Sequence, residues 1–327
     1  MEKVILLADP KSSCWEFAQS IKNYIQKQKQ HNIPLEQIEI SHFRNGELRL
    51  HVPNSVRKMD VYYIADSKKD PQEWLSELIL AKDLILNASA SSLNYVLPNL
   101  LFTRQDRKDM PHVPISARAV ARSLESYKVG RVITMDIHSD AVAGNYAPEI
   151  PVDTLYSFPE VVKYLIANHK SKLENLVVVS PDAGGGKRVE AFIKRLGKEG
   201  IDCPMALMYK SRPEAGEVDK ISLAGDVSGK DALLVDDIID SGKTLNKAAT
   251  ELRKKGAKGV YCYGCHGLFT MGVEELYKNF DLIFTSNTHS VPDKYKSDKL
   301  EAIDVSPTFA EAIYRAQLGD SISELFD

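Results

Sequence analysis

The segment at residues 231–244 carries the residue types that bind a phosphorylated sugar. An apolar run ends in two acids, and two apolar residues later the chain reads Asp-Ser-Gly-Lys-Thr. A Ser-Gly-Lys-Thr turn that opens a helix offers backbone N–H groups, the helix dipole and two hydroxyls to a phosphate. The paired acids would repel a phosphate, so they suit sugar hydroxyls or a metal bridged to them. The predicted ribose 5-phosphate site comprises Asp236, Asp237, Asp240, Ser241, Gly242, Lys243 and Thr244.

This turn does not fit the Walker A pattern of nucleotide-binding loops. That pattern requires a glycine at the position where Asp237 stands, well before the Gly-Lys-Thr of the turn. The glycine-rich segment at 180–188, SPDAGGGKR, is predicted to be a strand end, a turn and a helix start. Open α/β sheets bind ligands at the carboxyl ends of their strands, so the segment at 231–244 is placed where a ligand is expected.

The elements that must position these residues alternate along the chain. Short β-branched runs such as Leu176–Val179 and Leu233–Val235 predict buried strands, and amphipathic stretches such as Lys187–Leu196 and Leu245–Lys255 predict helices. Strands of this kind, alternating with helices, are typical of parallel sheets covered on both faces. The sequence therefore predicts an α/β protein, and its 327 residues favour two domains at about 150 residues each.

Composition excludes several classes of protein. The chain has 42 Lys and Arg against 45 Asp and Glu, a net charge of −3, which argues against a nucleic-acid coating protein. No apolar run approaches the length of a membrane-spanning helix, and the first residues lack a cleavable signal pattern. Four cysteines are too few for a disulfide scaffold, so we expect a reducing, cytoplasmic compartment. The charge balance and the lack of a long apolar run lead us to expect neither a nucleic-acid nor a membrane partner.

Four further segments, taken with the acidic loop, resemble the ribose-phosphate pyrophosphokinase (phosphoribosyl diphosphate synthetase) family. They are FRNGE at 43–47, RQDRKD at 104–109, TMDIH at 134–138 and SPDAGGGKR at 180–188. Type I phosphoribosyltransferases share the acidic loop, but single-domain transferases have no counterpart of RQDRK. The resemblance spans nearly the whole chain. It implies two phosphoribosyltransferase-like domains, residues 1–153 and 154–300, with the tail 301–327 packing back on the first.

The resemblance also implies how ATP and a metal are bound. The ATP-binding residues that it implies are Phe43, Asn45, Glu47, Arg104, Gln105, Asp109 and His138. In the family, the first three reach the adenine from a neighbouring subunit, so a homo-oligomer of at least a dimer is expected, and family members assemble further into hexamers. His138 and Asp182 are implied to bind Mg²⁺ with the ATP phosphates. Hard cations prefer oxygen ligands, so His138 is expected to act partly through water.

The charged stretch Lys210–Asp219 contains Pro and Gly and is predicted to be a mobile loop. The family places a Lys-x-Arg pair here that closes over the transition state, which assigns Lys210 and Arg212 as catalytic. In an extended chain these two side chains lie on one face, so both can contact a transferred phosphoryl group. The implied reaction transfers the diphosphoryl group of ATP to the C1 hydroxyl of ribose 5-phosphate.

Two alternatives remain open from the sequence. Lys243 adds a positive charge to the 5-phosphate loop, which allows a larger acceptor of the ribose 5-phosphate type, such as ADP-ribose. A non-catalytic regulatory homologue is the other alternative. The presence of Lys210, Arg212 and both loop acids argues against that second reading.

Overall fold

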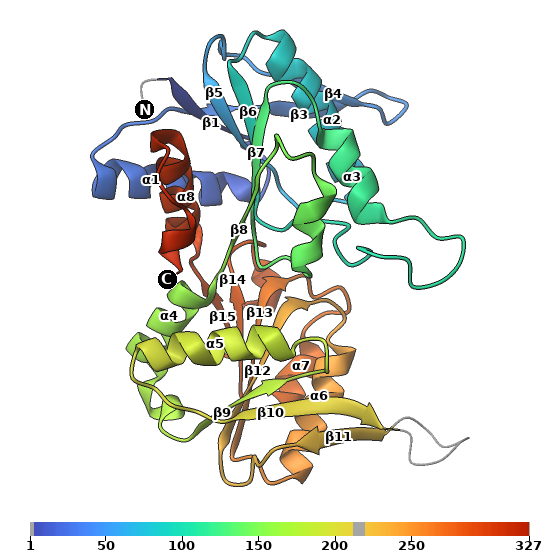
Figure 1. The fold of residues 1–327 in the computed structure, drawn as a ribbon, viewed down its shortest axis with the longest axis vertical. Coiled ribbons are helices and arrows are strands. Elements are labelled where there is room, and N and C mark those ends of the chain that lie inside the picture. The colour runs from blue at the N-terminus through green and yellow to red at the C-terminus, as the bar shows by residue number, and fades with distance from the viewer. Residues whose placement is uncertain (1–2, 212–219, 327) are drawn as a thin grey trace. The chain divides into compact units, whose positions relative to one another are not determined.

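The chain folds into two compact units, which are described separately (Figure 1). The computed structural model describes residues 3–211 and 220–326, without the side chains of residues 210, 211, 220 and 221. Unit 1 comprises Met1–Tyr156, Thr288–Ser290 and Val305–Asp327, and unit 2 comprises Ser157–Asn287 and Val291–Asp304. Both units are parallel sheets flanked by helices, which confirms the predicted α/β class. The domain bounds given above stay predictions.

Unit 1 is built on a six-stranded parallel sheet with the strand order β2-β1-β5-β6-β7-β8. Its elements are β1 Val4–Ala8, α1 Cys14–Lys29, β2 Leu35–Gln37, β3 Glu39–His42, β4 Leu48–His51, β5 Asp60–Ile64, α2 Pro71–Asn87, β6 Ser92–Leu97, α3 Ser116–Leu124, β7 Val129–Met135, the 3-10 helix η1 Asp140–Asn145, β8 Val152–Leu155, α8 Ser306–Leu318 and the 3-10 helix η3 Ser323–Leu325.

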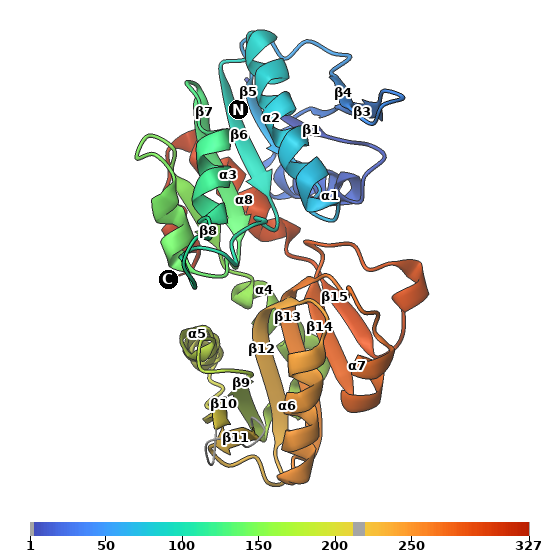
Figure 2. The same cartoon turned by 90° about the vertical axis from the view of Figure 1, so that its right-hand side faces the viewer.

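Helices cover both faces of this sheet (Figure 2). On one face α2 and α3 bury Trp74, Leu78 and Val120 against β-strand residues such as Tyr63 and Tyr95. On the other face α1 and the C-terminal helix α8 lie side by side, with the rings of Phe17 and Phe309 packed edge to face at 5.2 Å. Because both faces are covered, β1 reads as five consecutive buried apolar residues.

The segment at 35–42 is divided between two sheets. Residues Leu35–Gln37 pair in parallel with β1, whereas Glu39–His42 pairs with β4 in a separate two-stranded antiparallel sheet. The chain changes sheets at Ile38, whose fully buried side chain anchors the transition. The β3–β4 hairpin is therefore held apart from the main sheet of unit 1.

Unit 2 is built on a seven-stranded sheet with the order β11-β10-β9-β12-β13-β14-β15, in which only the β10–β11 pair is antiparallel among the described strands. Its elements are α4 Phe158–Leu173, β9 Leu176–Ser180, α5 Gly186–Lys198, β10 Met205–Ser211, β11 Lys220–Ala224, β12 Asp231–Ile239, α6 Lys243–Lys254, β13 Gly259–Gly267, α7 Glu274–Asn279, β14 Leu282–Ser286, the 3-10 helix η2 Asp293–Tyr295 and β15 Leu300–Ile303.

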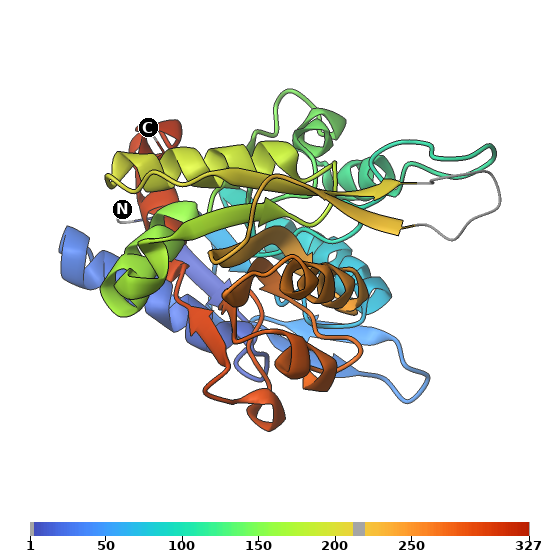
Figure 3. The same ribbon diagram turned by 90° about the horizontal axis from the view of Figure 1, so that it is seen from below.

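The two faces of this sheet are also covered, by α6 and α7 on one side and by α4 and α5 on the other (Figures 2 and 3). Leu245, Leu252 and Leu276 belong to the core on the first side. On the second side Phe158 contacts Phe192 and Tyr263 with ring centroids 5.1 and 6.5 Å apart. This packing fixes the starts of α5 and α6 beside the carboxyl ends of β9 and β12.

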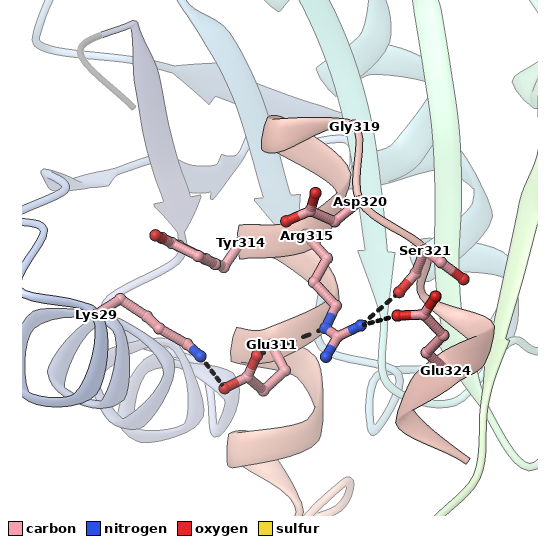
Figure 4. A pocket seen from close by; sticks show the side chains of 8 residues that line it. All are labelled: Lys29, Glu311, Tyr314, Arg315, Gly319, Asp320, Ser321 and Glu324. Carbon is pink, nitrogen blue, oxygen red and sulfur yellow. Dashed lines mark hydrogen bonds and ion pairs between the residues drawn. The ribbon is translucent and has the colours of Figure 1, made fainter. Parts of the chain in front are cut away.

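An open polar hollow in unit 1 lies between α1 and the tail after α8 (Figure 4). The Lys29 ammonium lies 2.6 Å from Glu311 at this hollow. The Arg315 guanidinium lies 3.3 Å from Glu324 and donates to the Ser321 carbonyl at 2.7 Å. The hollow therefore serves to fasten the C-terminal tail to unit 1. Among residues 3–211 and 220–326, no helix has both the length and the apolar character needed to cross a membrane.

Candidate functional site

The paired acids lie within a strand, which corrects their predicted place at a strand end. Strand β12 runs on past Val235 to Ile239, because Ile238 and Ile239 continue the parallel pairing with β13 at His266 and Gly267. Asp237 is buried, and Asp236 is partly exposed. The Asp236 Oδ1 atom accepts a hydrogen bond from the Asp237 backbone N–H at 2.9 Å. The two carboxylates are thereby fixed to one rigid, central strand.

A guanidinium bridges the two acids. Arg188, in the first turn of α5, places Nη1 3.3 Å from Asp236 Oδ1 and Nη2 3.4 Å from Asp237 Oδ2. Burial, together with the neighbouring Asp237, raises the pKa of Asp236, and the Arg188 charge opposes that rise. Because Asp236 and Asp237 share the single cation of Arg188, the two acids can still accept from further hydrogen-bond donors.

The turn after β12 leads directly into the start of α6. Gly242 adopts a left-handed φ of 70°, and a Cβ atom there would lie 2.9 Å from Leu276 Cδ2, so only glycine fits without displacement. No side chain caps α6, and Lys243 and Thr244 are exposed at its first turn. Its first N–H groups have no intrahelical partner, which makes this helix start suited to an anion.

The other residues of the turn shape it. The Asp240 Oδ1 atom accepts from the Thr270 hydroxyl at 2.7 Å, so this acid joins the turn to the loop after β13. The Ser241 Oγ atom accepts weakly from the Lys243 backbone N–H at 3.5 Å. The predicted ribose-phosphate residues 236–244 therefore lie together at one edge of unit 2.

Asp182 lies at the same sheet edge, after β9, which is the neighbour of β12. Its Oδ1 atom accepts from the Gly185 backbone N–H at 2.9 Å, and its own carbonyl accepts from the Ser180 hydroxyl at 2.6 Å. A Cβ atom on Gly185 would lie 2.8 Å from Ser180 Oγ, which explains a glycine at this position. The turn holds an exposed carboxylate beside the start of α5.

The first two residues of the predicted mobile loop at Lys210–Asp219 belong to a strand instead. Lys210 and Ser211 belong to β10, because their backbones pair with Ile221 and Lys220 of the antiparallel strand β11. Strand β10 is parallel to β9, so Lys210 occupies the same sheet edge as Asp182. Arg212 and the rest of the predicted loop to Asp219 lie outside the described residues.

In unit 1, the predicted ATP-binding residues follow the neighbouring strands β6 and β7. Arg104, Asp109 and His138 are exposed. Gln105 is fixed to the start of α3, because its side chain accepts from the Ser116 hydroxyl and its carbonyl accepts from the Ala117 backbone N–H at 3.3 Å. These residues thus lie at the carboxyl edge of the unit 1 sheet.

The remaining predicted residues form the tip of the β3–β4 hairpin. Phe43 is 52% exposed, and Asn45 and Glu47 are exposed beside it. The tip is closed by hydrogen bonds from Phe43 N–H to the Glu47 carbonyl at 2.8 Å and from Glu47 N–H to Asn45 Oδ1 at 3.3 Å. A ring exposed to this extent is not a core residue of unit 1.

Sequence reasoning missed the bridging role of Arg188. It lies within the glycine-rich segment, but a motif does not tell which side chains cross to another strand. One signal was present: a basic residue in the first turn of a helix is electrostatically unfavourable unless an anion compensates it. Asp236 and Asp237 are those anions, and only the three-dimensional structure brings them within reach.

Two models of known families match this chain. Residues 10–127 match the family model for the N-terminal domain of ribose phosphate pyrophosphokinase, and residues 205–327 match the phosphoribosyl synthetase-associated domain. Ribose-phosphate pyrophosphokinase 4 of Saccharomyces cerevisiae is 39% identical over 300 residues, which cover 91% of this chain and 89% of the relative. The Aquifex aeolicus ribose-phosphate pyrophosphokinase is 37% identical over 289 residues, covering 88% and 90%.

A solved structure extends the likeness to the fold of the whole chain. The phosphoribosylpyrophosphate synthetase from Mycobacterium smegmatis superposes with a TM-score of 0.84 at 26% identity, covering 97% of this chain and 99% of that one. The chain belongs to the ribose-phosphate pyrophosphokinase family.

Proposed function

We propose that this protein transfers the diphosphoryl group of ATP to the C1 hydroxyl of ribose 5-phosphate, which gives 5-phosphoribosyl 1-diphosphate and AMP. One observation carries the acceptor: on a single strand and turn, paired carboxylates precede the uncapped start of α6. Carboxylates accept from sugar hydroxyls, and the helix start takes the phosphate. The names of the relatives favour this acceptor over a larger ribose conjugate such as ADP-ribose, and favour an enzyme over a non-catalytic homologue.

The donor is proposed to bind through the strand ends of unit 1. Arg104 and His138 are exposed there, and a guanidinium matches phosphate oxygens in a fixed two-point geometry. Gln105 and Asp109 offer an amide and an acid to the nucleotide. Because Gln105 is held by the start of α3, its neighbour Arg104 has a defined backbone position.

Lys210 and Arg212 are proposed to stabilise the transferred group. The C1 hydroxyl of the sugar attacks the β-phosphorus of ATP, the bond from that phosphorus to the AMP oxygen breaks, and negative charge spreads over the phosphoryl oxygens. Cations placed where this charge develops lower the barrier, and accurate positioning of the hydroxyl supplies much of the rest. The backbone of Lys210 lies at the correct edge of the sheet for this role.

Mg²⁺ is the proposed cofactor, with Asp182 and His138 as the residues that would hold it. Within the described part of the chain, no group of three or more His, Cys, Asp or Glu could hold a metal by itself. Asp182 supplies one carboxylate, and Mg²⁺ is usually held by one or two carboxylates together with substrate phosphates and water. When bound with ATP, the ion would neutralise phosphate charge. The exposed, turn-fixed carboxylate of Asp182 suits it.

A homo-oligomer of at least a dimer is proposed, with the hairpin tip of one copy serving the ATP site of another. Phe43, Asn45 and Glu47 are exposed on a hairpin that lies apart from the main sheet. The outer face of α2 also exposes Ile79 and Leu80 at 37% and 41%. Apolar side chains grouped on one helix face favour a protein interface. Gel filtration that returned one active chain per particle would contradict this assembly.

We place the reaction in the cytoplasm, with small molecules and copies of this chain as the only partners. None of the four cysteines forms a disulfide and all four are buried, which supports a reducing compartment. The near balance of charge supports the exclusion of nucleic acid. Membrane association is not part of the proposal.

An acceptor panel tests the reaction. The protein is incubated with ATP and Mg²⁺ and with ribose 5-phosphate, ribose or ADP-ribose, and AMP release is measured. The expected result is AMP release with ribose 5-phosphate, in equal amount to the phosphoribosyl diphosphate formed. Turnover with ADP-ribose and none with ribose 5-phosphate would overturn the proposed acceptor, whereas no turnover with any acceptor would overturn the proposed reaction.

The Lys210→Ala variant tests the catalytic assignment. Removal of one cation from the developing charge is expected to lower kcat on the order of 10³-fold, with the affinity for ribose 5-phosphate little changed. Its thermal unfolding should match that of the unmodified protein. A fully folded Lys210→Ala variant with ordinary kcat would remove this residue from the mechanism.

A further inference from the structure

The guanidinium of Arg188 contacts two acids of strand β12, outside its own helix. Helix α5 packs on the core through Val189, Phe192 and Leu196, so the helix does not need Arg188 for burial. The side chain is 17% exposed and places one Nη atom on each of Asp236 and Asp237. A planar fork can contact two separate carboxylates at once, whereas an ammonium acts as a single point charge.

The position of Arg188 is unfavourable for the helix itself. It stands in the first turn of α5, where the helix dipole repels a cation, and the same helix carries Arg195 and Lys198 in its last turn, where the dipole attracts cations. The first turn contains no acidic residue. The Arg188 cation is therefore stabilised at this helix start by the two acids of β12.

Without a cation between them, the adjacent carboxylates of Asp236 and Asp237 would repel each other. Asp236 is close enough to Asp237 for that neighbour to disfavour its charged form. With one cation placed between them, both side chains are held in fixed orientations on the same strand. The two hydroxyls of a ribose need acceptors whose positions are set before binding, since ordering them on binding costs affinity.

We infer that Arg188 is a positioning residue for the sugar: it orients the Asp236 and Asp237 carboxylates to accept from the ribose hydroxyls. The inference rests on the proposed function and adds to it a residue that does not itself contact the acceptor. It acts on recognition of a vicinal diol rather than on the 5-phosphate or on ATP. Its loss should therefore raise the KM for ribose 5-phosphate selectively.

The test compares Arg188→Ala with Arg188→Lys and with a control, Arg195→Ala. Arg195 lies on the same helix and pairs with Glu199 at 2.7 Å, so its loss removes the same charge outside the sheet edge. For Arg188→Ala, the KM for ribose 5-phosphate should rise about 10- to 100-fold while the KM for ATP stays within about twofold. Arg188→Lys should lie between, and Arg195→Ala should match the unmodified protein.

Chemical rescue separates positioning from a merely structural role. Guanidinium chloride, added to Arg188→Ala at concentrations far below those that unfold proteins, should restore the KM for ribose 5-phosphate, and equal urea should not. An unchanged KM in Arg188→Ala, or a raised KM that guanidinium fails to restore, overturns the inference. If Arg188→Ala does not fold, an ordinary KM in a folded Arg188→Lys overturns it, and a selectively raised KM supports it.

Failure of the proposed function gives a different result. An unmodified protein that releases no AMP with ribose 5-phosphate overturns the proposed function and this inference together. An unmodified protein that turns over, beside an Arg188→Ala variant with unchanged KM, overturns the inference alone.

Discussion

Helix α2 in unit 1 and helices α5 and α6 in unit 2 begin in opposite ways. At the start of α2, the Asp70 side chain accepts from the backbone N–H groups of Gln72 and Glu73 at 2.9 and 3.3 Å, and Pro71 occupies the first turn. Helices α5 and α6 begin after Gly185 and Gly242 with no side-chain cap and no acidic residue in the first turn. Their first turns carry Lys187, Arg188 and Lys243 instead.

The difference agrees with the proposal that the start of α6 binds a phosphate, whereas the start of α2 serves the fold alone. A helix N-terminus is stabilised by nearby negative charge and by acceptors for its first N–H groups. Helix α2 obtains both from its own residues, so nothing further is required of that end. Helices α5 and α6 obtain only part of this from their surroundings: Asp182 accepts from the Gly185 N–H before α5, and Ser241 accepts weakly from the Lys243 N–H of α6. Their first turns also add cations, so a bound anion would stabilise these helix starts further.

The largest effect is expected from giving α6 the acidic start typical of α2. In Lys243→Glu, a carboxylate replaces the exposed ammonium at the first turn, which favours the helix but repels the 5-phosphate of the acceptor. The KM for ribose 5-phosphate should rise about 100-fold, while the melting temperature stays equal or rises slightly. Steady-state kinetics and a thermal melt measure the two.

A matched variant controls for charge alone. Lys247 is exposed one turn further along α6, so Lys247→Glu makes the same charge change away from the helix start. Kinetics of Lys247→Glu should resemble those of the unmodified protein. Equal increases in KM for both variants would show that net charge, and not the helix start, controls acceptor binding.

The second effect concerns the paired acids between the two helix starts. Arg188 favours the charged form of Asp236, but burial and Asp237 outweigh it and raise the pKa of Asp236 above its ordinary value near 3.8. Between these two pKa values, Asp236 therefore keeps its proton in the folded protein and releases it in the unfolded chain. The stability linked to this proton is complete below the unfolded pKa and is lost as the pH rises through the folded pKa. The free energy of unfolding falls by about 1.4 kcal/mol for each pH unit between these two values.

Asp236→Asn removes this loss because an amide carries no proton to release. The variant should match the unmodified protein in melting temperature at low pH and exceed it increasingly as the pH rises toward the raised pKa of Asp236, at about 8, while its activity with ribose 5-phosphate falls. Thermal melts across that pH range, with Asp226→Asn as an exposed acid outside the site, measure the difference. A gap between the two proteins that narrows with rising pH would contradict the assigned direction.

Much of the fold could be predicted from the sequence because strands that are buried on both faces have unbroken runs of apolar residues. Val177–Val179 and Leu233–Val235 lie within β9 and β12 as expected. Element ends were harder to predict, since they depend on pairing with distant strands: β12 continues to Ile239 only because β13 is beside it. The change of sheets at Ile38 depends on β1 and β4 in the same way.

The site in unit 2 was more predictable than the one in unit 1 for a physical reason. The turns after β9 and β12 are short and glycine-rich, so residue type and position in the sequence nearly determine where Asp182 and Gly242 lie. Arg104 lies in a longer loop between β6 and α3, whose course depends on contacts such as Gln105 with α3. The sequence alone does not specify such contacts.

The smallest effect is expected at α2, where the helix start serves only the fold. Asp70→Ala removes the acceptor for the N–H groups of Gln72 and Glu73, and loss of such a cap costs about 1 kcal/mol. The melting temperature should fall by roughly 2–4 °C for a unit of this size, with kcat and both KM values unchanged. A cap that only satisfies its own helix has no means of acting on the acceptor or on ATP. If Asp70→Ala instead altered the KM for either substrate, α2 would also take part in binding. The division between structural and ligand-binding helix starts would then fail.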